Sequence, residues 1–176
     1  MKEIIVISGK GGTGKTSISA SFAVLAKRSV IVDCDVDAAD LHLVLSPRIL
    51  EHHDFYSGKE AIIRQEDCKS CGQCYNHCRF HAIDGKESNP QKFLVNPLLC
   101  EGCGVCVHFC PARAIDFPER SCGEWMVSET LWGPMVHARL GIASGNSGKL
   151  VSTIRKKAKS IAQEKNYSLI IVDGPP

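Results

Sequence analysis

The sequence lacks a long apolar run and an excess of charge of either sign. Its 176 residues carry a formal net charge of +2, so nothing indicates a surface for a polyanion and we expect no nucleic-acid partner. The first apolar segment, Ile4–Ile7, follows Met1-Lys2-Glu3 directly and is too short for a secretory signal core or a membrane span. We therefore expect a cytoplasmic protein without a membrane segment. The length allows one or two modest domains with a real core.

Cysteine, by contrast, is abundant: there are 10, and a reducing cytosol would keep them free to bind metal. Eight of them form two runs of the same spacing, offset by 32 residues: Cys68-x2-Cys71-x2-Cys74-x3-Cys78 and Cys100-x2-Cys103-x2-Cys106-x3-Cys110. The repeat continues past the cysteines, because Ala82-Ile83-Asp84 recurs as Ala114-Ile115-Asp116. This spacing predicts the ligands of two [4Fe–4S] clusters.

Zinc is the alternative metal, since paired C-x2-C units also form structural zinc sites. Such sites usually combine two neighbouring cysteines with two distant ones, whereas four cysteines crowd each run here. The remaining two lie outside both runs. Cys34 is expected to be a buried packing residue, and Cys122 is expected to bind no metal.

A glycine-rich segment near the start has the pattern of a phosphate-binding loop. Its glycines let backbone N–H groups wrap around triphosphate oxygens, and the helix that follows directs its positive N-terminal dipole at the anion. Lys15 is expected to reach the β- and γ-phosphates, and the Thr16 hydroxyl is expected to bind Mg²⁺. The predicted ATP site consists of Gly9, Lys10, Gly11, Gly12, Thr13, Gly14, Lys15, Thr16 and Ser17.

The pattern around this loop predicts a βαβ unit. Glu3–Ser8 has the composition of a fully buried strand, a helix is expected from Gly14 to about Arg28, and Val30–Asp33 has the composition of a second buried strand. The expected apolar stripe of the helix contains Ile18, Phe22, Leu25 and Ala26. Strand, loop, helix and strand at this spacing indicate a parallel sheet with helices on both faces.

The segment 58–120 differs in composition and has its own repeat, so we expect a separate module inserted between two parts of a nucleotide-binding domain, 1–57 and 121–176. The elements expected after the module are a hairpin of Glu124–Leu131 and Met135–Leu140, a helix from Ser147 to about Lys165, and a buried strand at Leu169–Val172. Domains rarely end within an apparent catalytic turn such as the one at Asp173. We therefore expect the chain to be truncated.

Lys10 makes the glycine-rich loop more specific. With a lysine directly after Gly9, in Lys-Gly-Gly-x-Gly-Lys-Thr, the segment resembles the deviant phosphate loop of the MinD/ParA/nitrogenase-iron-protein family. The resemblance implies that Lys10 crosses a dimer interface and contacts the partner's nucleotide, as a catalytic residue beside Lys15. It also implies that Asp35 positions the attacking water and lies with Asp33 near Mg²⁺, and that Asp173 supports Mg²⁺ through water.

The cysteine module resembles bacterial-type two-cluster ferredoxins, in which the last cysteine of each run binds the other cluster. The resemblance implies an α+β ferredoxin-like fold and two ligand sets: Cys68, Cys71, Cys74 and Cys110 for one [4Fe–4S] cluster, and Cys100, Cys103, Cys106 and Cys78 for the other. Pro111 follows Cys110 as in that family, whereas Arg79 follows Cys78. That departure leaves the number of ligands unchanged.

Together with the stretches 33–43, 133–138 and 146–150, these motifs resemble the MinD-superfamily ATPases that carry an inserted ferredoxin domain. The resemblance implies an α/β P-loop NTPase fold of the SIMIBI or MinD-like class, interrupted by the 2[4Fe–4S] module, with the C-terminal part of the ATPase domain and its base-contacting residues missing. It implies an enzyme that hydrolyses ATP.

In such an enzyme, nucleotide-dependent dimerisation, with a second copy or with a paralogue, would be coupled to electron transfer or cluster handling. The implied partner is an unidentified redox protein or an apo-iron–sulfur protein. Two alternatives remain: a scaffold or carrier for cluster assembly, and a MinD-like spatial organiser whose clusters are structural or redox-sensing.

Overall fold

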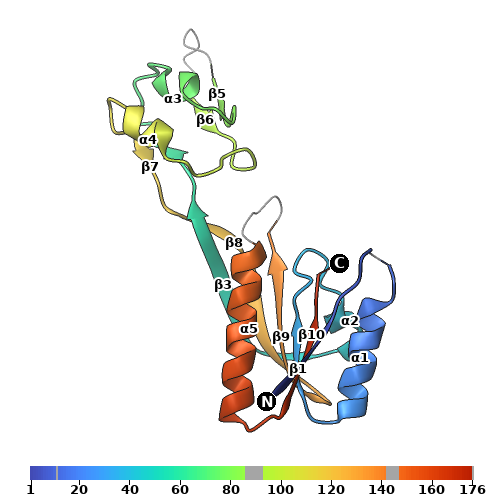
Figure 1. The fold of residues 1–176 in the computed structure, drawn as a ribbon. Helices are drawn as coiled ribbons and strands as arrows, with labels where there is room; N and C mark the ends of the chain where they lie inside the picture. Colours follow the sequence, from blue (N-terminus) through green and yellow to red (C-terminus); the bar gives the residue numbers. More distant parts are fainter. Residues whose placement is uncertain (11, 86–92, 142–146, 176) are drawn as a thin grey trace. The chain divides into compact units, whose positions relative to one another are not determined.

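The computed structural model describes residues 1–10, 12–85, 93–141 and 147–175 (Figure 1). The chain divides into two compact units: Met1–Phe55 with Cys122–Pro176, and Tyr56–Ser121. The first unit contains the glycine-rich loop, and the second contains both cysteine runs. The identity of these units as an ATPase domain and an inserted ferredoxin-like domain stays a prediction.

Six strands form the main sheet, in the order β1-β10-β2-β9-β8-β3 (Figure 1). Neighbours from β1 to β9 pair in parallel, and β8 runs antiparallel to β9. The mostly parallel sheet and the hairpin after the cysteine runs are therefore confirmed. The bounds are β1 Lys2–Val6, β2 Val30–Asp33, β3 Arg48–Lys59, β8 Glu119–Thr130, β9 Gly133–Leu140, β10 Leu169–Asp173, α1 Lys15–Ala26, α2 Leu41–Leu45 and α5 Ser147–Glu164.

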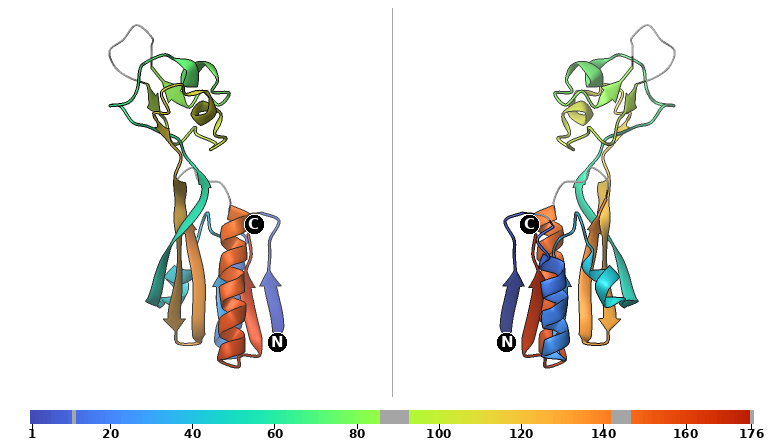
Figure 2. Two further views of the ribbon diagram at one scale, coloured as in Figure 1. Left: turned by 90° about the vertical axis from the view of Figure 1, so that its left-hand side faces the viewer. Right: turned by 90° about the vertical axis from the view of Figure 1, so that its right-hand side faces the viewer.

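Helices cover both faces of this sheet (Figure 2). α5 packs on one face, whereas α1 and α2 pack on the other. Alternation along β2 explains the division, because Val30 and Val32 join the α5 cluster and Ile31 joins the α1–α2 cluster. Strands that are buried on both faces are typical of a parallel sheet between helices. Within the described ranges, no helix is long and apolar enough to cross a bilayer.

The sequence predicted α5 and the β8–β9 hairpin correctly. On α5, one stripe at spacings of three and four residues is buried: Leu150, Ile154, Ala158 and Ile161. At the start of β9, Gly133 has a φ of 138°, and a Cβ atom there would collide with the carbonyl oxygen of Ser29. Only glycine therefore fits at this position of the turn.

Two predictions of burial are wrong. β1 lies at the edge of the sheet, where β10 is its partner among the described strands, and Ile5 is 48% exposed. On α1, three of the four residues of the expected stripe are turned outwards: Leu25 is 76% exposed, and Ile18 and Phe22 are exposed as well. The fourth, Ala26, is partly buried against the core. The residues that α1 buries are Lys15, Ser19, Ala20 and Ala23. Small side chains let this face approach the sheet closely, which a search for large apolar residues does not detect.

The second unit is built from short strands that pair across the two cysteine runs. β4 (Ile62–Ile63) precedes the first run and pairs with β7 (Ile115–Asp116), which follows the second. β5 (Ile83–Asp84) follows the first run and pairs with β6 (Leu94–Val95), which precedes the second. The third cysteine of each run lies in a short helix, Cys74 in α3 (Gln73–Asn76) and Cys106 in α4 (Val105–Phe109). Each half of the unit thus completes its sheet with the other half.

Candidate functional site

The glycine-rich loop joins β1 to α1 and borders an open cavity. Gly12 and Gly14 have φ of 76° and 82°, in the left-handed region that other residues rarely adopt, and Gly14 is the N-cap of α1. The first N–H groups of a helix have no partner inside it, so this end suits an anionic ligand. The cavity has a volume of about 530 Å³ and is lined by Ser8, Gly12, Thr13, Gly14, Lys15, Thr16, Asp35, Asp37, Ala38 and Asp40.

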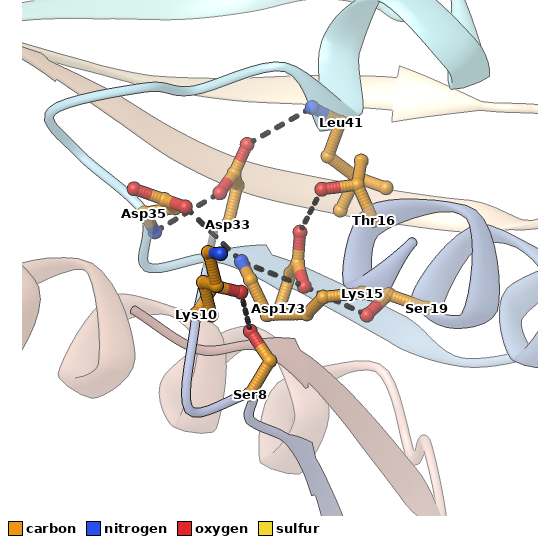
Figure 3. Close-up of polar contacts among 9 residues, drawn as sticks. All are labelled: Ser8, Lys10, Lys15, Thr16, Ser19, Asp33, Asp35, Leu41 and Asp173. Carbon is orange, nitrogen blue, oxygen red and sulfur yellow. Dashed lines mark hydrogen bonds and ion pairs between the residues drawn. The ribbon is translucent and has the colours of Figure 1, made fainter. Parts of the chain in front are cut away.

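Lys15 and Thr16 meet two acidic side chains, Asp35 from the loop after β2 and Asp173 from the end of β10 (Figure 3). The Lys15 ammonium lies 3.1 Å from Asp35 Oδ2 and 3.2 Å from Asp173 Oδ1. Thr16 Oγ1 donates to Asp173 Oδ2 at 2.9 Å, and Ser19 Oγ donates to Asp173 Oδ1 at 2.9 Å. Three side chains from the first turns of α1 therefore hold the carboxylate of Asp173 in place at the end of β10.

Ser19 is a site residue that the sequence prediction missed. Its side chain is fully buried, and its hydroxyl is bonded to Asp173. The available signal was its spacing from Thr16, because residues three apart lie on the same face of a helix. Two hydroxyls on the buried face of α1 indicate a polar partner beneath the helix, although spacing alone does not name it.

Burial and neighbouring charges shift the pKa of two side chains of this group, Lys15 and Asp33. Burial by itself would lower the pKa of Lys15, but hydrogen bonds and charge interactions with Asp35 and Asp173 outweigh it and raise the pKa. Burial raises the pKa of Asp33 to about 7, although Asp33 accepts hydrogen bonds from the N–H groups of Asp35 at 3.1 Å and Leu41 at 3.2 Å. Lys15 is therefore charged at neutral pH, whereas Asp33 is protonated in moderately acidic solution.

Lys10 is placed differently from Lys15. It is exposed on the loop, and none of the ion pairs among the described residues involves its ammonium. Its carbonyl oxygen accepts a hydrogen bond from Ser8 Oγ at 3.0 Å (Figure 3). Gly9, Lys10 and Ser17 are not among the described residues that line the cavity. Gly11, and Asn146 of the stretch 146–150, lie outside the described residues.

Asp173, Asp33 and His137 lie in one row across three neighbouring strands. In the register, Asp173 is the partner of Asp33, and Asp33 is the partner of His137. Each stands two residues after a member of the α1–α2 cluster, so all three side chains are on that face. Burial lowers the pKa of His137 to about 4, and its Nε2 lies 2.8 Å from Ser128 Oγ. The sequence prediction gave His137 no role.

Replacing His137 and Asp33 should change the pH dependence of stability in opposite directions. His137 has a folded pKa of about 4 against an ordinary 6.5, so its contribution is complete above pH 6.5 and is lost as the pH falls towards 4. Asp33 has a folded pKa of about 7 against 3.8, so its contribution is complete below pH 3.8 and is lost as the pH rises through 7. When the pH is lowered, the unfolding free energy of His137→Gln should therefore fall by up to about 3 kcal/mol less than that of the parent. The unfolding free energy of Asp33→Asn should fall by more than that of the parent, because the variant lacks the stabilisation that Asp33 gives in acid.

Denaturant unfolding of the nucleotide-free protein, followed by tryptophan fluorescence, measures these slopes. Both tryptophans, Trp125 and Trp132, belong to the first unit, so the signal reports on that unit. Val136→Ala is the matched control, because Val136 is buried on the α5 face of the same strand as His137. It should lower stability without altering the pH slope. Parallel pH curves for the parent and both variants would contradict the assigned pKa values.

In the second unit, the cysteine runs surround two cavities. Each cavity brings three cysteines of one run together with the last cysteine of the other run. Each cavity has a volume of about 20 Å³, and the walls include Phe93 in the first and Phe117 in the second. The cysteines that line them are Cys68, Cys71, Cys74 and Cys110 in the first, and Cys100, Cys103, Cys106 and Cys78 in the second.

The backbone repeats its geometry around the two cavities. The N–H of Ala82 donates to Cys78 Sγ at 3.4 Å, and the N–H of Ala114 donates to Cys110 Sγ at 3.3 Å. Such bonds stabilise sulfur as a thiolate, the form that binds metal. Equivalent positions of the two runs also share a positive φ: Ser70 and Gly102, Gly72 and Gly104, and His81 and Arg113.

Across the described part of the chain, no three His, Cys, Asp or Glu side chains are grouped so that they could hold a metal ion. This applies to the acidic residues beside the loop as well as to the cysteines. Burial raises the pKa of Cys74 to about 11 and raises that of Cys106 as well, so these thiols keep their protons at neutral pH while no metal is bound. Cys34 and Cys122 are buried in the first unit, outside both sets.

Comparison with known proteins gives matches along almost the whole chain. Residues 4–172 match the family model for the CobQ/CobB/MinD/ParA nucleotide binding domain. An uncharacterized protein of Methanocaldococcus jannaschii is 40% identical over 181 residues, and the match covers 99% of this chain and 59% of that protein. This chain thus spans about three fifths of the length of that relative.

Two shorter matches cover about a third of this chain. An uncharacterized ATP-binding protein of Methanocaldococcus jannaschii is 40% identical over 65 residues, which are 34% of this chain and 25% of that protein. The septum site-determining protein MinD of Buchnera aphidicola subsp. Baizongia pistaciae is 38% identical over 68 residues, which are 35% of this chain and 25% of that protein.

Proposed function

Because the chain belongs to the CobQ/CobB/MinD/ParA nucleotide-binding family, we propose that it binds ATP with Mg²⁺ and hydrolyses it as a nucleotide-dependent dimer, with a second copy or a paralogue. The observation that carries this proposal is the meeting of Lys15 and Thr16 with Asp35 and Asp173 beside an open cavity. Triphosphate hydrolysis needs an ammonium for the phosphates, a hydroxyl for Mg²⁺ and carboxylates for Mg²⁺ and water. This group supplies all of them at one helix N-terminus.

Each member of the group has a distinct proposed role. Backbone N–H groups from Gly9 to Ser17 hold the phosphate oxygens, and Lys15 binds the β- and γ-phosphates. Asp35, which is ion-paired with Lys15 in the structure, becomes free to position water once the phosphates attract the ammonium. Attack of that water on the γ-phosphorus then releases ADP and inorganic phosphate.

The remaining residues of the group serve the metal. Mg²⁺, when bound, neutralises charge on the β- and γ-phosphates. The Thr16 hydroxyl is its proposed protein ligand, and Asp173 orients the water around it with Asp33 close by. Thr16 and Asp173 are already bonded to each other at 2.9 Å, so both stand at one place before any ligand arrives. Lys10 is proposed to act in the partner subunit.

We propose two [4Fe–4S] clusters as the cofactors of the cysteine-lined cavities. When bound, such clusters take up and release single electrons. Four thiols line each cavity, and in each set a backbone N–H is directed at the cysteine that comes from the other run. In a cubane the four thiolates bind different irons, so they surround a volume and do not meet at one point. A zinc ion needs four ligands at about 2.0–2.3 Å from one point, which makes zinc the weaker proposal.

Electron transfer to a redox partner protein is the proposed use of the clusters. A scaffold or carrier of clusters for apo-iron–sulfur proteins is the second candidate, and the exposure of Cys71 and Cys103 favours it, because an acceptor must reach the ligands. A spatial organiser would need a free amphipathic helix for a membrane surface. Among the described helices, the amphipathic α5 already buries its apolar stripe against the sheet. A cytoplasmic location is part of the same proposal.

The proposed coupling predicts that MgATP alters the clusters. Protein purified without oxygen should contain about eight irons and eight sulfides per chain. A reductive titration followed by EPR should then give different curves with and without MgATP, because closure of a nucleotide dimer favours one state of the clusters. Lys15→Ala is the control: it should retain the iron but lose the nucleotide effect, since the phosphates lose their ammonium.

Each outcome decides one part of the proposal. Stoichiometric zinc without sulfide, in oxygen-free material, would overturn the clusters. Eight irons with identical titrations in the presence and absence of MgATP would overturn the coupling. Rapid transfer of intact clusters to an apo-acceptor would select the scaffold in place of the electron carrier.

A further inference from the structure

The β2–α2 loop, residues 34–40, lines the cavity and is tied at both ends. At its start, the N–H of Cys34 donates to the carbonyl oxygen of Asp173 at 2.8 Å. At its end, the N–H of Leu41 donates to Asp33 Oδ2 at 3.2 Å, so a side chain from β2 caps the first residue of α2. The other oxygen of the same carboxylate, Asp33 Oδ1, accepts a hydrogen bond from the N–H of Asp35 at 3.1 Å, so Asp35 and the first residue of α2 share one anchor. α2 itself is only five residues long. A helix this short is stable only through what it packs against.

A buried histidine of the neighbouring strand packs beside α2. The rings of His42, in α2, and His137, in β9, lie nearly parallel, with centroids 6.1 Å apart and planes 11° apart. His137 is 5% exposed, and its Nε2 lies 2.8 Å from the buried hydroxyl of Ser128 on β8. A ring tied to a neighbouring strand cannot turn freely, so it presents a fixed surface to His42.

We infer that His137 is a positioning residue for ATP hydrolysis, which supports α2 through His42 and thereby sets the position of Asp35. The inference rests on the proposed ATPase function. The path is short, because Asp33 and His137 are register partners on strands about 4.8 Å apart. A leucine could fill the same space without the cost of burying a polar ring. The hydrogen bond to Ser128 fixes the orientation of the imidazole ring. An apolar side chain has no such bond, so packing alone would not fix its orientation.

This role predicts a loss of turnover without a loss of ATP affinity. The phosphate-binding residues Lys15 and Thr16 belong to α1, whereas the ring contact of His137 is with His42 of α2. Asp35 belongs to the supported loop, and a displacement of about 1 Å in a catalytic group costs on the order of 10²-fold in rate. His137→Leu and His42→Ala should therefore lower kcat about 10- to 100-fold and leave the Kd for ATP within about twofold. His137→Gln should restore much of kcat, because its amide can bond to Ser128.

Hydrogen exchange provides a test that needs no nucleotide. In His137→Leu and His42→Ala, the Leu41 amide should exchange about tenfold faster than in the parent, while the buried amides of α5 should keep their rates. Val136→Ala is the matched control, because it truncates an equally buried neighbour on the opposite face of β9. It should lower stability and leave both kcat and the exchange at Leu41 unchanged.

Failure of this inference and failure of the proposed function are distinguishable. Unchanged Leu41 exchange in His137→Leu and His42→Ala would overturn the support of α2, whether or not the chain hydrolyses ATP. A parent that binds no ATP would overturn the proposed function, and the exchange data would still decide how α2 is held. If His137→Leu does not fold, His42→Ala gives the same comparison at a half-buried position.

Discussion

Replacing Lys10 with alanine should preserve ATP binding and reduce turnover by about 10³-fold or more. The site already has a lysine of its own, since Lys15 is buried and bonded to Asp35 and Asp173. Lys10 is exposed and joins none of the described ion pairs, so its charge is available to a second nucleotide. A lysine delivered across a closed dimer stabilises charge that develops in the transition state, an effect worth roughly 4–7 kcal/mol for an arginine finger.

Mixed dimers show whether Lys10 acts across the interface. Lys10→Ala and Asp35→Ala subunits should each be inactive alone. In a mixed dimer, one of the two sites keeps its own Asp35 and receives Lys10 from the other subunit. An equimolar mixture should therefore recover about a quarter of the parent turnover, because half of the dimers are mixed and one site in each is complete. If Lys10 acts within its own subunit, mixing restores nothing.

Two measurements keep this prediction separate from a general loss of structure. The Kd for a fluorescent ATP analogue should be the same in Lys10→Ala and the parent, because Lys15 and the loop backbone remain. Lys27→Ala removes another exposed lysine, at the end of α1, and should leave turnover unchanged. Equal turnover in Lys10→Ala and the parent would remove the role of Lys10 in trans. A large loss of ATP affinity would place Lys10 in its own site instead.

The parts of the fold that were predicted correctly are those whose sequence signal lies in residues adjacent along the chain. The apolar runs of β2 and β10, the stripe of α5 and the Gly133 turn each carry their signal in adjacent residues, and the structure contains all of them. The burial of β1 and α1 depends on which neighbours cover them, and no local pattern contains that information. α1 buries Ala20 and Ala23 while Phe22 faces outwards. Apolar composition therefore predicted the presence of α1 correctly but predicted the wrong face of the helix as the buried one.

The same distinction separates the site residues that were predicted from those that were missed. Lys15 and Thr16 were predicted from the glycine-rich loop and Asp173 from the family resemblance, and the structure brings the three side chains together. Ser19 and His137 acquire their contacts through strands that are distant in the sequence, so their partners follow only from the sheet register. In the second unit, β4 of the first half pairs with β7 of the second, and β6 of the second half pairs with β5 of the first. The repeated cysteine spacing does not specify this pairing.

Replacing Cys78 with serine should remove the cluster that we propose for the opposite cysteine run. Cys78 lines the same cavity as Cys100, Cys103 and Cys106, although it belongs to the first run. Serine is a poor ligand for iron, so the iron content should fall from about eight to about four per chain. Alkylation without oxygen, mapped by mass spectrometry, should then modify Cys100, Cys103 and Cys106 and spare the other set. Cys110→Ser should give the reciprocal pattern, with Cys68, Cys71 and Cys74 modified.

The alkylation pattern tests the exchange of ligands, which iron content alone cannot do. Loss of four irons is expected for any ligand, whereas modification of the opposite run is expected only if the last cysteines are exchanged. Cys34→Ser is the control: Cys34 is buried in the first unit, outside both cavities, and its loss should leave the iron content and the protection of all eight thiols unchanged. Modification of Cys68, Cys71 and Cys74 in Cys78→Ser would assign each cluster to its own run. The pairing of β4 with β7 and of β5 with β6 argues against that outcome, because each of these pairs joins a strand from one half of the unit to a strand from the other.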